Sequence, residues 1–114
     1  MQWFLMIVTA LHGLIHTMGF FNETGVKKFD GFSGDTLIRL ASGPRHILGF
    51  VWLVAALLMV VVAVGIAART SWWKPLAIAT LVVSQALIII WWPDAKMGTI
   101  PNIILLLAVI FWEQ

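Results

Sequence analysis

Two histidines stand four residues apart in the stretch LHGLIHTMGF, which covers residues 11 to 20. Residues at i and i+4 share one face of a helix, so the side chains of His12 and His16 are expected to point the same way. Two imidazoles on one face can ligate a divalent metal ion, with His46 or Asp94 as further ligands. The intervening glutamate of the H-E-x-x-H motif is missing, which argues against that class of zinc protease.

The same pair of histidines has other chemical interpretations. Either His12 or His16 could be an axial ligand of a haem, but not both of the same haem, because axial ligands come from opposite faces. Histidine also titrates near neutral pH, which suits a quinone or proton-handling site. Finally, both imidazoles could simply donate and accept hydrogen bonds that hold neighbouring helices together. The spacing alone leaves these alternatives open.

The composition indicates which elements must position these histidines. Hydrophobic residues make up 61% of the chain and charged residues 11%, whereas charged residues are about a quarter of a soluble protein. A membrane-spanning helix needs roughly 20 apolar residues, and four uncharged runs of about that length occur, at about 3–21, 46–68, 72–92 and 98–112. Tryptophans lie mainly at the ends of these runs, as expected at membrane interfaces. The sequence therefore predicts an all-α, integral membrane four-helix bundle in a single domain, 1–114.

The connections between the four runs are unequal in length. Only the first, at about 22–45, is long, and the two short ones favour an up-down topology. Within the long connection, SGDTLIRLAS at 33–42 predicts a short helix lying along the membrane interface. Gly43 and Pro44 are expected to end it, and Pro44 also suits the first turn of the second span.

Charge and cysteine content bound the location and the partners. The first and third connections carry more basic residues than the opposite side, which predicts that these loops are cytoplasmic in a multi-pass protein of the cell (inner) membrane. The lipid bilayer is the expected partner, and a net charge of +2 is too small to argue for nucleic acid. The absence of cysteine excludes disulfides and thiolate metal sites.

Polar residues within the spans fall at similar depths when residues are counted from one end. Ser84 and Gln85 match the depth of His12, and Asn102 lies near the depth of His16. Strongly polar groups deep in a membrane usually face the bundle interior. The sequence therefore predicts a polar chamber, open toward the first and third loops and lined by His12, His16, His46, Ser84, Gln85 and Asn102.

Three short motifs together resemble a known group of proteins. The motifs are H-x-x-x-H-x-x-G-F in the first span, S-Q in the third, and D-A-K-x-G-T-x-x-N before the fourth. This combination resembles small, mostly uncharacterised bacterial membrane proteins whose four-helix architecture is similar to that of the DoxX-like families. The resemblance implies the fold. Because DoxX-type relatives are associated with membrane redox complexes near quinones, it also favours the quinone and metal interpretations.

The sequence supports two functional hypotheses of different classes. In the first, the chamber binds a metal ion or a redox cofactor, haem or quinone, through His12, His16, Ser84, Gln85 and Asn102. In the second, the protein is a non-catalytic accessory subunit that scaffolds a larger membrane complex; a homo-oligomer is the other assembly that the sequence allows. A protein that binds a small molecule or a lipid is a third possibility. Whether the protein is an enzyme stays open at this point.

Overall fold

The regular structure of the described chain is entirely helical. The computed structural model describes residues 2–24 and 36–112. The elements, in chain order, are α1 (Gln2–Thr24), α2 (Ser42–Ala67), α3 (Trp73–Ile90), the short α4 (Trp92–Ala95), the 3₁₀ helix η1 (Lys96–Gly98) and α5 (Thr99–Phe111). Four segments of the described chain are long and apolar enough to cross a membrane, and they are α1, α2, α3 and Trp92–Phe111. The predicted all-α class is confirmed, and the four predicted spans correspond to four helical segments that are long and apolar enough to cross a membrane.

The helix boundaries differ from the predicted ones where polar residues continue a helix. α1 extends to Thr24, three residues beyond the uncharged run, and α2 begins at Ser42 with Pro44 in its first turn. Between α3 and α5, the predicted loop is instead helical, as α4 and η1. A run of uncharged residues ends at the first charge, whereas helical hydrogen bonding continues through charged residues at the interface. Helix lengths that are predicted from the positions of charged residues are therefore too short.

The predicted interfacial helix at 33–42 is not found in the part of it that the structure describes. Residues 33–35 lie outside the described residues, and Thr36–Ala41 are non-helical. The backbone N–H of Leu37 instead donates to the carbonyl of Ile90 at 2.8 Å. Ile90 is the last residue of α3, where carbonyls lack helical donors. This segment therefore completes the end of α3 rather than forming a helix of its own.

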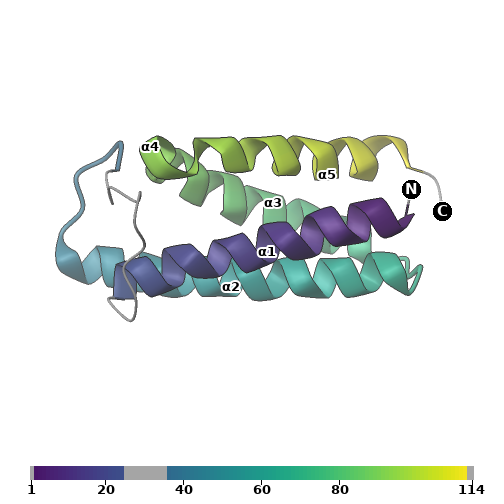
Figure 1. Ribbon diagram of the computed structural model, residues 1–114, viewed down its shortest axis with the longest axis horizontal. Coiled ribbons are helices and arrows are strands. Elements are labelled where there is room, and N and C mark those ends of the chain that lie inside the picture. The colour runs from purple at the N-terminus through teal and green to yellow at the C-terminus, as the bar shows by residue number, and fades with distance from the viewer. Residues whose placement is uncertain (1, 25–35, 113–114) are drawn as a thin grey trace.

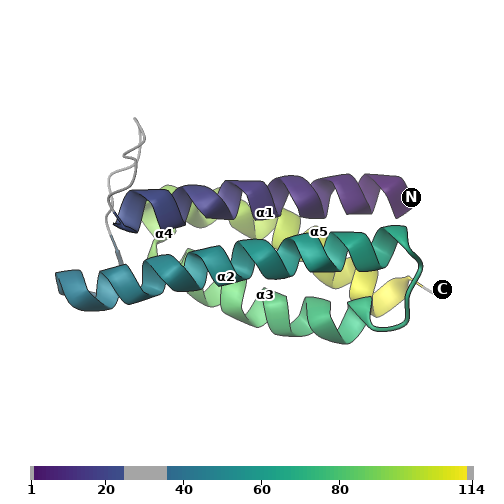
Figure 2. The ribbon, with the colours of Figure 1, turned by 90° about the horizontal axis from the view of Figure 1, so that it is seen from below.

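The helices form an elongated body in which α1 and α2 lie side by side along most of their length (Figures 1 and 2). The body measures 43 × 22 × 22 Å, so its long axis exceeds the roughly 30 Å of a hydrocarbon core. Both chain ends lie at the same end of the body (Figure 1). α1 approaches α2 closely at Gly13, where an added Cβ would stand only 2.8 Å from Cβ of Met59. Small residues allow this kind of close helix packing in membranes.

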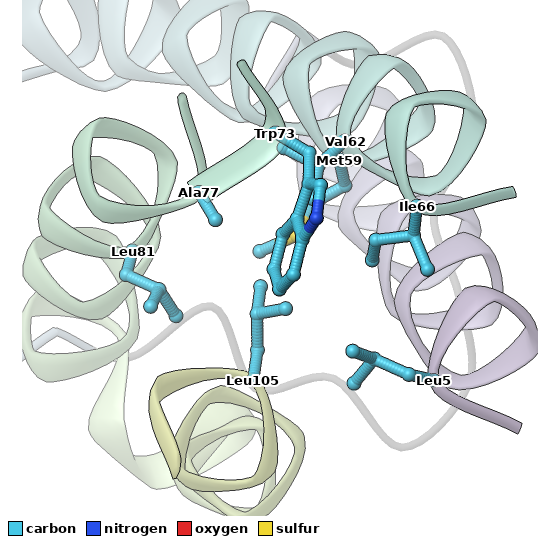
Figure 3. Close-up of a cluster of buried hydrophobic side chains, with 8 residues drawn as sticks. All are labelled: Leu5, Met59, Val62, Ile66, Trp73, Ala77, Leu81 and Leu105. Carbon is cyan, nitrogen blue, oxygen red and sulfur yellow. The ribbon is translucent and has the colours of Figure 1, made fainter. Parts of the chain in front are cut away.

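Two clusters of buried apolar side chains fill the bundle. The larger one gathers side chains from α1, α2, α3 and α5 around the indole of Trp73 (Figure 3), and consists of Leu5, Met59, Val62, Ile66, Trp73, Ala77, Leu81 and Leu105. The second consists of Trp52, Ala55, Leu87, Ile88 and Trp91. Along α3, Ser84 lies between Leu81 of the first cluster and Leu87 of the second. A polar layer therefore separates two apolar cores.

Candidate functional site

The polar layer begins with the two histidines of α1. Nδ1 of His16 lies 2.7 Å from the backbone carbonyl oxygen of His12, and Nε2 of His16 lies 2.7 Å from Oγ of Ser84. A carbonyl can only accept, so Nδ1 of His16 carries the hydrogen of the neutral ring. Nε2 of His16 then accepts a hydrogen bond from the hydroxyl of Ser84.

Asn102 of α5 closes this layer into a ring of hydrogen bonds. Its Nδ2 donates to Oγ of Ser84 at 3.1 Å and to Oε1 of Gln85 at 3.0 Å. Its Oδ1 accepts from Nε2 of His12 at 2.8 Å. Each member donates to the next. The His12 ring donates to Asn102, and the Asn102 amide donates to Ser84. The Ser84 hydroxyl donates to His16, and Nδ1–H of His16 donates to the backbone carbonyl of His12. Gln85 extends the ring by donating to Oγ1 of Thr99 at 3.1 Å.

The ring joins three helices in a buried, water-poor setting. The side chains of His12, His16, Ser84 and Asn102 are all buried, and each has a partner within the ring. Buried polar networks whose members are satisfied fix one arrangement of the elements that carry them. The ring therefore sets how α1, α3 and α5 meet.

The structure brings together all five residues that were predicted to bind a cofactor. The pairing differs in detail from the depth count, because His12 meets Asn102 and His16 meets Ser84. Depth was counted along each helix as if all helices stood parallel, whereas α3 crosses the other helices at an angle (Figure 1). The count was therefore accurate only to about one helical turn.

The predicted metal site does not form. His46 is exposed in the first turn of α2, whereas His12 and His16 are buried in the core. Within residues 2–24 and 36–112, no three histidine or acidic side chains gather closely enough to hold a metal ion. His16 also has both ring nitrogens engaged inside the protein. The described structure therefore does not bring the four predicted metal ligands together.

A cavity of about 240 Å³ lies next to the ring. Its walls come from α1, Trp52 of α2, the end of α3, and the α4–η1 corner. The lining residues are His12, Ile15, His16, Gly19, Asn22, Glu23, Trp52, Ile88, Trp91, Asp94, Ala95, Met97, Gly98 and Pro101. Pockets for drug-sized ligands occupy about 300–1,000 Å³, so this cavity suits a small head group.

One carboxylate of the cavity wall, Glu23, was not predicted from the sequence. Its Oε1 accepts from Nη2 of Arg45 at 2.7 Å and from the indole N–H of Trp91 at 3.0 Å. The uncharged run ended at Phe21, which placed Glu23 in the first loop. The spacing held a signal nonetheless, because Glu23 follows His16 by seven residues, or two helical turns on the same face.

We expect Glu23→Gln to lower the free energy of unfolding by about 1–2 kcal/mol. The substitution keeps the acceptor for Trp91 but removes the charge that faces Arg45, whose side chain is 30% exposed and therefore partly screened. Unfolding in mixed micelles by increasing SDS measures this loss. Lys96→Gln, which removes an exposed charge at the same end of the protein, is the control. Equal effects of the two variants would argue against the ion pair.

One ring nitrogen of His12, Nδ1, forms no hydrogen bond in the described structure and lies on the side of the cavity. Its Nε2 donates to Asn102, so Nδ1 of the neutral ring is an acceptor, and no residue of the described chain donates to it. The neighbouring ring carbon Cε1 lies 3.3 Å from the position that a Cβ on Gly98 would take. Both His12 and Gly98 line the cavity. The cavity thus combines aromatic and aliphatic walls with an available acceptor.

Comparison of the chain with protein-family models, with curated proteins and with solved structures found no match to any of them.

Proposed function

We propose that this protein is a multi-pass membrane protein that binds a small lipophilic molecule with a polar head, of the quinone class. The cavity carries this proposal, because Trp52, Trp91 and Ile88 supply apolar walls next to the imidazole of His12. A mostly apolar pocket with a few convergent polar groups is the usual form of a small-molecule site. Because the comparisons found no match, the proposal rests on the site itself.

The proposal includes a place in the membrane. We propose an up-down bundle in the inner membrane of a bacterium, with the first and third connections on the cytoplasmic side. The excess of basic residues in these connections supports this orientation. The cavity then lies in the cytoplasmic half of the bilayer, because Asn22, Glu23 and Asp94 line it near these connections.

Filling the cavity provides the test. Gly98→Leu adds a side chain whose Cβ alone would lie 3.0 Å from Cδ1 of Ile88 and 3.3 Å from the His12 ring. It removes no polar side chain of the ring. We expect this variant, reconstituted in nanodiscs, to bind a short-chain benzoquinol at least about tenfold more weakly, because the added side chain occupies the site of the head group. Equilibrium dialysis measures the affinity.

A matched control is available at Gly43, where an added Cβ would meet nothing within 4 Å. Gly43→Leu makes the same chemical change outside the cavity and should leave the affinity unchanged. If the two leucine variants bind equally well, or if the unmodified protein binds no benzoquinol, the proposed function is wrong.

A second function is favoured by the weak burial of the fourth span. Only 11% of its most apolar window is buried inside the described structure, compared with 28% for α1 and 39% for α2 and α3. A different subunit covering this face would make the protein an accessory subunit of a membrane complex. Purification in mild detergent should then recover a stoichiometric partner, whereas a monodisperse single chain would argue against this function.

A further inference from the structure

The exposure of the cavity's lining residues shows where the cavity opens. Ile15 of α1 is 57% exposed and Met97 of η1 is 66% exposed. The other lining residues are buried or only half-buried. Ile15 lines the cavity from α1, and Met97 lines it from η1. The mouth therefore lies between these two side chains.

This mouth faces sideways rather than toward the loops. Asn22, Glu23 and Trp91, which line the cavity near the loop end, are buried. The exposed residue on α1, Ile15, lies in the middle of a helix that is apolar enough to cross a membrane, so in a bilayer it would face hydrocarbon. A molecule dissolved in the bilayer therefore meets the mouth directly, without passing through water.

The cavity wall offers an acceptor and a donor, because Nδ1 of His12 can accept and the buried indole N–H of Trp52 forms no hydrogen bond in the described structure. Nδ1 of His12 has a free lone pair, and the carboxylates of Glu23 and Asp94 can only accept when ionised. A head group with only carbonyl oxygens could accept from the indole N–H of Trp52 but would find no partner at Nδ1 of His12. A neutral head group with a hydroxyl matches the wall better, because a hydroxyl can donate to Nδ1 and also accept from the indole, and it adds no negative charge beside Glu23 and Asp94.

We propose that the cavity takes up a neutral, lipid-soluble aromatic hydroxyl compound from the bilayer, through the mouth between Ile15 and Met97, and that its hydroxyl group donates to Nδ1 of His12. This inference rests on the proposed function and sharpens it. It states that the hydroxyl form of the ligand, which can donate a hydrogen bond, is the form that binds. It also assigns the path by which the ligand enters.

The hydroxyl donor is tested by changing the ligand rather than the protein, so that the ring of hydrogen bonds around Ser84 and Asn102 stays intact. The probes are a short-chain benzoquinol, the corresponding benzoquinone and the dimethyl ether of the quinol. The three probes share a six-membered carbon ring and a tail, but only the quinol can donate a hydrogen bond. We expect the quinol to bind at least about tenfold more tightly than the other two, because each of them leaves the acceptor of His12 unpaired.

The entry path is tested by widening one lipid-facing side chain at the mouth. Ile15→Trp should slow the association of the benzoquinol about tenfold in stopped-flow measurements, because the indole blocks the mouth. Met97→Trp should act in the same way from the opposite side. Leu14→Trp is the matched control, because Leu14 is 64% exposed on the same helix but does not line the cavity.

The outcomes separate the claims. Equal affinity for the quinol and its dimethyl ether would overturn the assigned donor, while the cavity would remain a binding site. Equal association rates for the Ile15→Trp, Met97→Trp and Leu14→Trp variants would overturn entry between Ile15 and Met97. Binding of none of the three probes would instead contradict the proposed function. Tight binding of the quinol alone, slowed only by the two mouth variants, supports the inference as a whole.

Discussion

Asn102→Leu should lower the free energy of unfolding by about 2–3 kcal/mol. Leucine has nearly the shape of asparagine but can neither donate nor accept. The change leaves Nε2–H of His12 without its acceptor, and removes the donor to Ser84 and Gln85. A single hydrogen bond between membrane helices contributes about 0.6 kcal/mol on average, and the larger expected effect reflects polar groups left unpaired in a buried layer.

Unfolding in mixed micelles with increasing SDS measures this effect. Ile103→Ala, which trims a half-exposed side chain next to Asn102, is the control and should cost less than about 0.5 kcal/mol. If Asn102→Leu costs no more than Ile103→Ala, the ring does not hold α5 in place. The ring would then be only a local arrangement of polar side chains.

Gly13→Leu should be at least as damaging, at about 3 kcal/mol, for a steric reason. A Cβ at this position would stand 2.8 Å from Cβ of Met59 and 3.1 Å from the carbonyl oxygen of Ala56. The carbonyl belongs to the backbone of α2 and cannot move aside alone, so α1 and α2 must separate. The same SDS titration measures the loss of stability.

The same substitution at Gly43 is again the matched control, since an added side chain meets nothing there. We expect Gly43→Leu to change the free energy of unfolding by less than about 0.5 kcal/mol. Comparable losses from the two variants would show that the cost arises from adding an apolar side chain and not from the close approach of α1 and α2.

The four spans were predictable because the bilayer imposes simple requirements. A span must be long, apolar and nearly free of charge, and each of these properties can be read from a sequence. The gathering of His12, His16, Ser84, Gln85 and Asn102 followed from a second requirement, that polar groups in a membrane find partners in the interior. Their pairing could not be predicted, because it depends on how the helices tilt.

The rotation of α2 explains why His46 did not join the site. The side of α2 that faces α1 includes Gly49, Trp52, Ala56 and Met59, at helical spacing. Extending this stripe back by four residues leads to Arg45, which indeed meets Glu23 of α1. His46 is one position further along, about 100° around the helix, and is exposed. Depth alone placed it correctly along the axis but gave no information about its direction.

The aromatic walls of the cavity could not be predicted from the sequence, which indicated only a polar chamber. Its aromatic walls, Trp52 and Trp91, are brought within 5.8 Å of each other, between ring centroids, by the packing of α2 against α3. Trp91 was interpreted as an interfacial residue because it ends a span. In the structure it is buried and donates to Glu23. Composition identifies residues that suit an interface, but packing decides which of them turn inward.

The unequal lengths of α2 and the fourth span have a consequence for the surrounding lipid. At 1.5 Å per residue, the 26 residues of α2 extend about 39 Å, whereas the 20 residues of Trp92–Phe111 extend about 30 Å. A bilayer adjusts its local thickness to the apolar length that it meets. In a bilayer, we therefore expect the acyl chains to be more extended beside α2 than beside the fourth span.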